Sequence, residues 1–244
     1  GVNHHLIGSK SIDEEYTINN FQNDFSIILK KIFQKNKICF LCGGSGLYID
    51  SVCKGFNKIP EVPDEIRLSL NNQLELEGLE KLCLELKEKD PITYKKIDKK
   101  NPRRIIRALE VCIFTKKPYS YFLSQDKEEK KFDVLYIFIN KDREELYQKI
   151  NLRVDEMIEK GLVEEVRGLK KYENKRPLQS IGYTEIFNYL KTKKSLNETI
   201  QLIKRNSRRY AKRQITWFKK NNYIEIENDF EKVKSLIESK IKTA

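Results

Sequence analysis

The stretch that follows Ser195 most constrains the fold, because it predicts one long helix with two unlike faces. Ser195 and Glu198 have the spacing of a capping box, in which each side chain bonds the other residue's backbone at a helix start. At about 100° per residue, the mostly apolar positions fall on one arc that we expect to pack on the rest of the fold. These positions are Leu196, Ile200, Ile203, Tyr210, Ala211, Gln214, Ile215, Trp217 and Phe218. The opposite half contains Thr216 and the cations Lys204, Arg205, Arg208, Arg209, Lys212, Arg213, Lys219 and Lys220.

The basic half of this helix predicts a polyanionic partner. No acidic residue lies between Lys204 and Lys220, so the charge is not compensated within the helix, and the 244-residue chain carries a net charge of +12. Gln214, Thr216 and Trp217 lie among the cations, and this mixture of hydrogen-bonding, stacking and cationic groups is typical of nucleic-acid surfaces. The alternative is a core face backed by a solvated charged face, which is the commoner role of such a helix. We favour nucleic-acid contact.

The cysteines and the apolar runs exclude several classes of protein. No apolar run is long enough to span a bilayer, and nothing resembles a signal peptide. Five scattered cysteines argue against a disulfide framework and for a reducing compartment. Cys39 and Cys42 have C-x-x-C spacing, but residues three apart on the expected strand face opposite ways, so we expect no zinc site. We expect a cytoplasmic protein with no membrane partner.

Strands alternate with helices in the outer parts of the chain. The apolar runs at residues 37–42, 132–140 and 222–227 predict strands separated by helices, which favours an α/β sheet with helices on both faces. Residues 64–115 predict short helices only, and the charged residues 126–131 predict a linker. We therefore expect an α/β core with C-terminal helices from residues 1–62 and 126–244, and a helical insertion domain from residues 63–125. Because three strands are few for such a sheet, we expect the chain to lack the beginning of the fold.

Two local patterns suggest chemistry. Residues 43–46 (Gly-Gly-Ser-Gly) join a predicted strand to a helix, and such a turn places backbone amides at the sheet edge where ligands bind. No Gly-Lys-Ser/Thr follows, so it is not a Walker loop, and a plain tight turn explains it equally well. Arg103, Arg104 and Arg107 cluster at a helix start, where cations oppose the helix dipole and an anionic partner would relieve the conflict. A solvated face is the alternative for this cluster.

Six motifs in order resemble the tRNA dimethylallyltransferases, also called tRNA isopentenyltransferases or the IPP transferase family. They are residues 2–7 (VNHHLI), 43–49 (GGSGLYI), 101–111 (NPRRIIRALEV), 153–157 (RVDEM, with Gly161 and Leu162), 181–183 (IGY) and 210–217 (YAKRQITW). The resemblance extends from residue 1 to about Trp217 and is specific as a set. It implies a P-loop nucleotide-kinase-like parallel sheet core with an all-helical insertion domain.

The resemblance also implies an activity and its residues. The family transfers a dimethylallyl group from dimethylallyl diphosphate to N6 of the adenosine immediately 3′ of the anticodon in tRNA, and the resemblance implies Mg²⁺ as a cofactor and the anticodon stem-loop as a partner. Ser45 takes the place of a family threonine near the reacting centre, as the expected catalytic hydroxyl, beside substrate-binding Gly43, Gly44 and Gly46. The expected tRNA-binding residues are Arg67, Arg103, Arg104, Arg107, Gln179, Ser180, Gly182, Tyr183, Thr184, Arg208, Lys212, Arg213, Gln214, Thr216, Trp217 and Lys219. We expect a monomer.

One departure from the family pattern bears on activity. The family's Walker-type loop and the following aspartate base would both precede Gly1, with most of the Mg²⁺ ligands. We therefore expect this chain alone not to bind the prenyl diphosphate productively. Two alternatives stay open: a non-catalytic tRNA-binding module derived from the family, and a relative that prenylates free adenine nucleotides. The two basic clusters disfavour the second, because a mononucleotide offers too few phosphates to use them.

Overall fold

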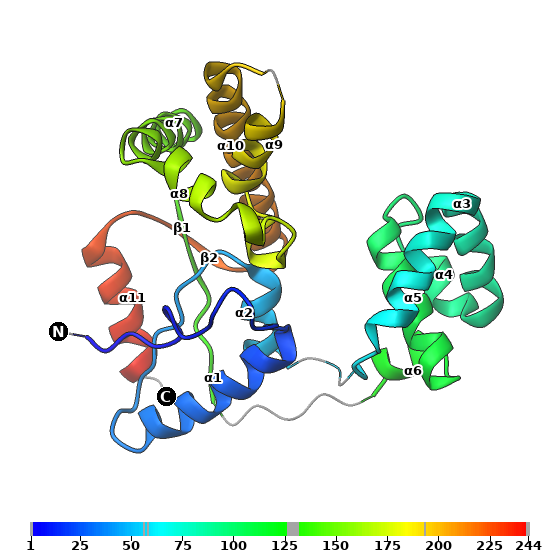
Figure 1. Cartoon of the computed structure of the whole chain (residues 1–244). Helices are drawn as coiled ribbons and strands as arrows, with labels where there is room; N and C mark the ends of the chain where they lie inside the picture. Colours follow the sequence, from blue (N-terminus) through cyan, green and yellow to red (C-terminus); the bar gives the residue numbers. More distant parts are fainter. Residues whose placement is uncertain (1, 56, 58, 126–131, 193, 243–244) are drawn as a thin grey trace. The chain divides into compact units, whose positions relative to one another are not determined.

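The computed structural model describes residues 2–55, 57, 59–125, 132–192 and 194–242 (Figure 1). The chain divides into two compact units, which we call unit 1 (Gly1–Cys53 with Phe132–Ala244) and unit 2 (Lys54–Lys131). The linker expected at residues 126–131 lies outside the described residues. No described helix is long and apolar enough to cross a membrane.

Unit 1 contains a small parallel sheet and most of the described helices. Its elements in chain order are α1 (Ile18–Phe33), α2 (Gly46–Cys53), β1 (Ile137–Asn140), α7 (Arg143–Glu159), α8 (Leu162–Gly168), the 3₁₀ turns η1 (Lys170–Tyr172) and η2 (Arg176–Leu178), α9 (Tyr183–Lys191), α10 (Leu196–Lys220), β2 (Ile224–Glu227) and α11 (Phe230–Lys242). Strand β1 pairs in parallel with β2, with Ile137 opposite Ile224 and Asn140 opposite Glu227. Parallel strands need a long crossover, and α7 to α10 supply it.

The strand expected at residues 37–42 does not form. In the part of the chain that the structure describes, the single sheet has two strands, β1 and β2. Residues 37–42 are irregular, and the side chains of Ile38 and Phe40 are exposed. An apolar run becomes a strand only when a neighbouring backbone accepts and donates its hydrogen bonds, and none of the described residues pairs with this run. The other two predicted strands are confirmed with shorter bounds.

Several helices begin at residues whose side chains cap them. The Ser195 hydroxyl accepts a hydrogen bond from Glu198 N at 3.1 Å, and Ser195 N donates to Glu198 Oε2 at 2.9 Å, which confirms the capping box of α10. Asp142 accepts from the backbone of Glu144 and Glu145 and so starts α7. Side-chain acceptors of this kind satisfy N–H groups that lack a partner inside the helix.

Unit 2 is helical, as expected for the insertion. It contains α3 (Asp64–Lys89), α4 (Pro91–Lys96), α5 (Pro102–Thr115) and α6 (Tyr119–Leu123). Gly78 interrupts the helical geometry of α3 with φ of +81°, a left-handed conformation that glycine adopts without steric cost. The sequence pattern did not predict α6.

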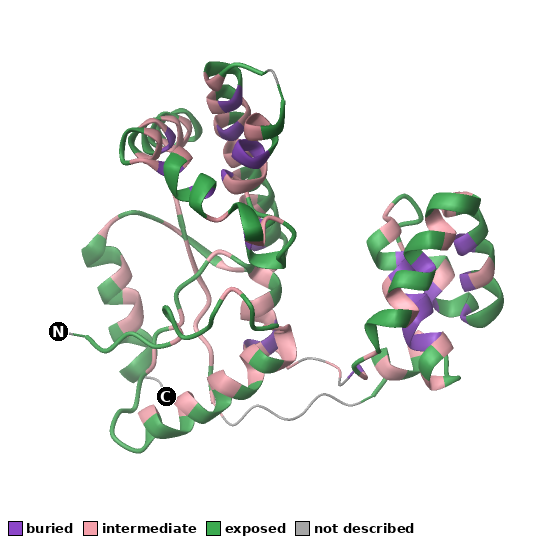
Figure 2. Ribbon diagram, viewed as in Figure 1, coloured by how far each residue is buried: buried purple, intermediate pink, exposed green. Residues whose placement is uncertain are grey.

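Each unit has its own apolar core, seen as separate purple patches in Figure 2. In unit 1 the buried residues join α7, α8, α9 and α10: Val154, Leu162, Val166, Leu178, Ile186, Phe187 and Ile203. In unit 2 they join α3 and α5: Leu70, Leu82, Cys83, Leu86, Ile105, Ile106, Ala108 and Leu109. Helix α10 is thus anchored by a core on one side, which leaves its other side available.

Candidate nucleic-acid interface

The glycine turn at residues 43–46 lies directly against α10. Gln214 Nε2 donates a hydrogen bond to the carbonyl oxygen of Gly44 at 2.9 Å. A β-carbon on Gly44 would lie 2.1 Å from Gln214 Nε2, and one on Gly46 would lie 2.1 Å from Trp217 Nε1. A β-carbon at these distances would force a neighbour to move, which the flexible end of Gln214 does more easily than the Trp217 ring, so the close approach requires glycine most clearly at Gly46. The structure therefore brings two of the sequence motifs into one place.

Ser45 lies at the start of α2, beside this contact. Its carbonyl oxygen accepts hydrogen bonds from Tyr48 N at 3.0 Å and Ile49 N at 3.2 Å, which closes the first turn of the helix. The side chain is exposed, and its hydroxyl forms no hydrogen bond with another described residue. A free hydroxyl next to the positive end of a helix is suited to an anionic ligand.

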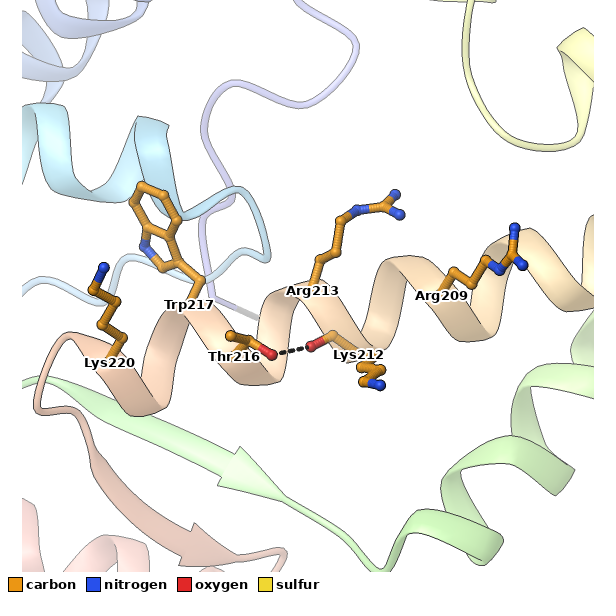
Figure 3. A pocket seen from close by; sticks show the side chains of 6 residues that line it. All are labelled: Arg209, Lys212, Arg213, Thr216, Trp217 and Lys220. Carbon is orange, nitrogen blue, oxygen red and sulfur yellow. Dashed lines mark hydrogen bonds between the residues drawn. The ribbon is translucent and has the colours of Figure 1, made fainter. Parts of the chain in front are cut away.

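A surface hollow of about 420 Å³ lies on α10 next to the turn (Figure 3). Its lining is one aromatic ring, one hydroxyl and four cations: Trp217, Thr216, Arg209, Lys212, Arg213 and Lys220. Figure 3 shows Arg209, Arg213 and Trp217 projecting from the same side of the helix. The Trp217 side chain is 37% exposed, so its ring is available for stacking. A hollow that combines an accessible indole with cations can hold an unstacked base and its phosphates.

The cations of the hollow are not neutralised by acidic neighbours among the described residues. The ion pairs of α10 that involve described residues are Lys204 with Asp155 at 2.6 Å and Lys219 with Glu225 at 3.1 Å. The guanidinium of Arg213 lies 5.5 Å from the ring centroid of Tyr210, which orients it without removing its charge. The hollow is consequently a concentrated positive surface.

The predicted division of α10 into two faces is wrong at several positions. The sequence pattern predicts that Tyr210 and Trp217 pack. In the structure Tyr210 is 41% exposed and Trp217 is 37% exposed, while Phe218 is buried. Trp217 follows Arg213 by four residues and precedes Lys220 by three, so it shares their face of the helix. The same spacing identifies Arg209 and Lys220 as residues of this face, although neither is among the tRNA-binding residues expected from the sequence.

Arg208 and Lys204 turn toward α7 rather than toward solvent. Arg208 Nη1 donates to Asn151 Oδ1 at 2.6 Å, and its guanidinium lies 5.9 Å from the ring centroid of Tyr147. Lys204 Nζ reaches Asp155, and only 13% of its side chain is exposed. Both cations were expected on the open basic half. They bury their aliphatic stems and hold the two helices together.

The segment of residues 179–184 forms the start of α9. Gly182, with φ of +99°, is buried, and its N–H donates to Glu185 Oε2 at 2.7 Å. The other oxygen of the buried Glu185 carboxylate accepts from Asn206 Nδ2 at 2.7 Å, which ties α9 to α10. The Tyr183 hydroxyl donates to Glu165, and this hydrogen bond, together with burial, raises the pKa of Tyr183 to about 12.

The members of this segment differ in accessibility. Gln179 and Ser180 are exposed, Tyr183 and Thr184 are half-buried, and Gly182 is buried. Gln179 Nε2 donates to the backbone oxygen of Glu173 at 2.6 Å. The accessible part of the segment is therefore its first two residues.

The arginines of unit 2 form a separate cluster. Arg67 of α3 and Arg107 of α5 both bind the carboxylate of Glu110, which is fully buried. Arg103 and Arg104, at the start of α5, are exposed. Glu110, three residues further along the same helix, thus supplies Arg107 with an anionic partner inside the unit.

The described residues show no ready-made protein site for the expected metal. They contain no group of three or more histidine, cysteine, aspartate or glutamate side chains that could hold an ion. Cys39 and Cys42 are free thiols, and burial, with the neighbouring Cys42, raises the pKa of Cys39. We derive no chemical step through Mg²⁺.

The sequence of this chain is similar to those of known proteins over most of its length. The model of the IPP transferase family matches residues 1–221. The tRNA dimethylallyltransferase of Christiangramia forsetii is 43% identical, over 98% of this chain and 80% of the relative. The tRNA dimethylallyltransferase 1 of Bacteroides thetaiotaomicron is 42% identical, over 91% of this chain and 72% of the relative.

Solved structures show the same architecture. The tRNA isopentenylpyrophosphate transferase of Bacillus halodurans has a TM-score of 0.65 at 34% identity, covering 100% of this chain and 78% of its own. A eukaryotic dimethylallyltransferase acting on tRNA has a TM-score of 0.73 at 26% identity, covering 93% of this chain and 60% of its own. Fold and site therefore define an α/β transferase with a P-loop-like core and a helical insertion, which confirms the predicted fold class. Within that class, this chain belongs to the IPP transferase family.

Proposed function

We propose that this protein transfers the dimethylallyl group of dimethylallyl diphosphate to N6 of the adenosine immediately 3′ of the anticodon in tRNA. The observation that supports this most is the contact between the glycine turn and the hollow on α10. It combines, within one unit, an exposed hydroxyl at a helix start, an accessible indole and four cations without described acidic partners. Membership of the IPP transferase family supports the same reaction.

The hollow would bind the anticodon loop. A base in a folded RNA loop has to be splayed out before an enzyme can reach its exocyclic amine, and splayed bases are held by stacking on aromatic rings. Trp217 is the stacking group that we assign, and Arg209, Lys212, Arg213 and Lys220 are the phosphate ligands.

The glycine turn would bind the diphosphate end of the prenyl donor. In the reaction the bond between the allylic carbon and the diphosphate oxygen breaks, the diphosphate leaves with the electron pair, N6 bonds to that carbon, and N6 releases one proton to solvent. Negative charge therefore grows on the leaving oxygen. We assign the Ser45 hydroxyl and the backbone amides at the start of α2 to donate hydrogen bonds to this charge.

The remaining expectations form part of the same proposal. Gln179, Ser180 and Thr184 at the start of α9, together with Lys219, would extend the RNA surface of unit 1, and Arg103 and Arg104 would provide one in unit 2. Mg²⁺ is the proposed cofactor and a monomer is the proposed state. Loss of transfer in excess EDTA, restored by added Mg²⁺, would support the metal, and light scattering would measure the oligomeric state.

The decisive experiment is transfer to an unmodified tRNA. The protein, Mg²⁺, dimethylallyl diphosphate and tRNA are incubated, and the nuclease fragments of the RNA are weighed by mass spectrometry. The proposal predicts one dimethylallyl group on the adenosine 3′ of the anticodon and none on a control tRNA that has guanosine there, whereas the expectation that this chain alone does not bind the prenyl diphosphate productively predicts no transfer. Binding of tRNA without any transfer would favour the non-catalytic module. The absence of both tRNA binding and transfer would contradict the proposal.

A further inference from the structure

Glu110 of α5 is a fully buried carboxylate between two half-exposed guanidiniums. It is 0% exposed, and it accepts hydrogen bonds from Arg67 Nε at 2.9 Å and Arg67 Nη2 at 3.0 Å. Arg107 Nη1 donates to the same carboxylate at 2.5 Å, and Arg107 Nη2 donates to the backbone oxygen of Pro60 at 3.3 Å. The Arg67 and Arg107 side chains are 41% and 34% exposed. Glu110 thus holds both guanidiniums inside the unit, and part of each arginine side chain is exposed.

Stability alone does not explain this arrangement. A buried ion pair costs desolvation free energy, and well-packed apolar side chains in its place are often as stable or more stable. Burial acts to raise the pKa of Glu110, but the hydrogen bonds and charges of Arg67 and Arg107 outweigh it and lower that pKa. The carboxylate is therefore ionised at neutral pH and holds both cations firmly. Glu110 fixes the positions of the two guanidiniums, and a functional role would explain this fixation.

Fixed guanidiniums bind phosphates better than mobile ones. A free arginine loses side-chain entropy when it meets a phosphate, whereas an arginine already held in place loses less. Arg103 and Arg104 are exposed one turn away on α5 and extend the same basic surface. The exposed carboxylate of Asp64 lies 3.5 Å from Arg67 Nη1, and such exposed pairs are weak enough for a phosphate to displace.

We propose that Glu110 is a positioning residue for RNA recognition, which holds Arg67 and Arg107 so that the exposed parts of their side chains bind backbone phosphates of the tRNA. The inference rests on the proposed function, because it assumes that tRNA is the ligand. It assigns Glu110 no contact with the RNA. The carboxylate acts through the two arginines.

The substitution Glu110→Gln separates positioning from plain charge. Glutamine keeps the shape of the side chain and removes its negative charge. If Glu110 merely neutralised the arginines, the variant would free two cations and bind tRNA more tightly. If Glu110 positions them, the arginines lose their fixed geometry and binding weakens. The two explanations thus predict changes of opposite sign.

Asp90→Asn is the matched control. Asp90 belongs to the same unit, is 1% exposed, and its carboxylate accepts hydrogen bonds from Thr93 and Ser120. The variant makes the same charge change at a second buried acid, and the forces that shift the pKa of Asp90 include no arginine. It reports both on destabilisation of the unit and on the electrostatic effect of losing one negative charge.

The affinity of the full chain for tRNA is measured over a range of salt concentrations, and transfer is measured at saturating tRNA. For Glu110→Gln we expect the Kd to rise about tenfold, as for the loss of a charged hydrogen bond, with a flatter dependence on salt and an unchanged rate at saturation. Asp90→Asn should keep the parent Kd and salt dependence. In an Arg67→Ala, Arg107→Ala background, Glu110→Gln should weaken binding no further.

An unchanged or lower Kd for Glu110→Gln would overturn the inference, as would an additive effect in the double-alanine background. Should Glu110→Gln fail to fold, Arg67→Lys and Arg107→Lys test the same point, because lysine keeps the charge without the fork of donors. Parent-like affinity in both lysine variants would equally overturn it. Failure of the unsubstituted protein to bind tRNA would contradict the proposed function itself, and would be recognised as a separate result.

Discussion

At the scale of the residue, single contacts decide what each motif can do. Gln214 belongs to a motif that the resemblance assigns to tRNA, yet its amide is occupied by the carbonyl of Gly44. Trp217 plays two parts, because one edge of its indole lies against Gly46 while the ring remains accessible in the hollow. Sequence patterns place residues on a helix face, but they do not show which neighbour a long side chain reaches. For that reason the Arg67–Glu110 and Arg208–Asn151 contacts, over 43 and 57 residues, could not be predicted.

Trp217 is the only tryptophan of the chain, so its fluorescence reports on the hollow directly. We expect an anticodon stem-loop RNA to quench this emission, because a base stacks on the indole. Trp217→Ala should weaken RNA binding by about 1–3 kcal/mol, which is the usual contribution of one stacked base. Trp217→Phe should retain part of that affinity. Unchanged emission at saturating RNA would exclude stacking on Trp217.

Gly46→Ala tests the close approach of the glycine turn to α10. The added methyl group would lie 2.1 Å from the indole nitrogen of Trp217, so either the ring or the turn has to move. We expect transfer to fall at least tenfold, because Ser45 and the hollow lose their registry. The matched control is Gly168→Ala, where no atom lies within 4 Å of the added carbon. Equal activity of the two variants would show that the contact is dispensable.

At the scale of the element, helices were predicted better than strands. A helix satisfies its hydrogen bonds internally, and its start can be predicted from a capping residue such as Ser195, which the structure confirms. A strand depends on residues elsewhere in the chain, so the apolar run at residues 37–42 gave a wrong prediction. The face of α10 was predicted in outline but wrong at Trp217, Tyr210 and Arg208, because a long helix meets different neighbours along its length.

Helix α10 offers a test of phosphate binding by single cations. Lys212→Ala removes an exposed cation of the hollow and should lower the slope of log affinity against log salt by roughly 0.7–0.9, the value for one phosphate contact. Lys234→Ala removes an exposed charge of α11 and serves as the charge-matched control. Arg208→Ala should instead lower the melting temperature, because Arg208 binds Asn151 of α7. The assignment fails if Lys212→Ala and Lys234→Ala give the same slope.

At the scale of the whole molecule, each of the two cores supports a different basic surface. The core of unit 1 anchors the helix that carries the hollow, and the core of unit 2 supports the arginine cluster. Composition and the absence of a strand pattern were enough to predict the helical insertion. The buried acids of unit 2 were not predicted, because Glu110 and Asp90 look like ordinary helix residues until their partners are known.

These two acids make unit 2 sensitive to low pH. Burial alone would raise both pKa values, but hydrogen bonds from the arginines lower that of Glu110, and hydrogen bonds from Thr93 and Ser120 lower that of Asp90. A lowered pKa in the folded state gives stability that is present above the unfolded values of 4.5 and 3.8 and is lost as pH falls through the folded values. The melting temperature should therefore fall steeply below about pH 4.5.

Circular dichroism melts at pH 7, 5 and 3 test this expectation. Glu110→Gln and Asp90→Asn should each be less stable than the parent at pH 7, and each should lose less stability than the parent on acidification. If all three proteins show the same pH dependence, neither carboxylate is responsible.

The hydrogen bond between Gln214 and Gly44 joins residues 170 positions apart, and β1 meets β2 only after the whole crossover of α7 to α10. Contacts so distant in sequence form late in folding, because closing a long loop costs chain entropy before the contact contributes any favourable free energy. During synthesis the glycine turn leaves the ribosome early, and its contact with α10 cannot form until α10 has also emerged. The contact between the glycine turn and α10 is therefore among the last features to assemble, and a nascent chain that stops before α10 has helices but lacks this contact.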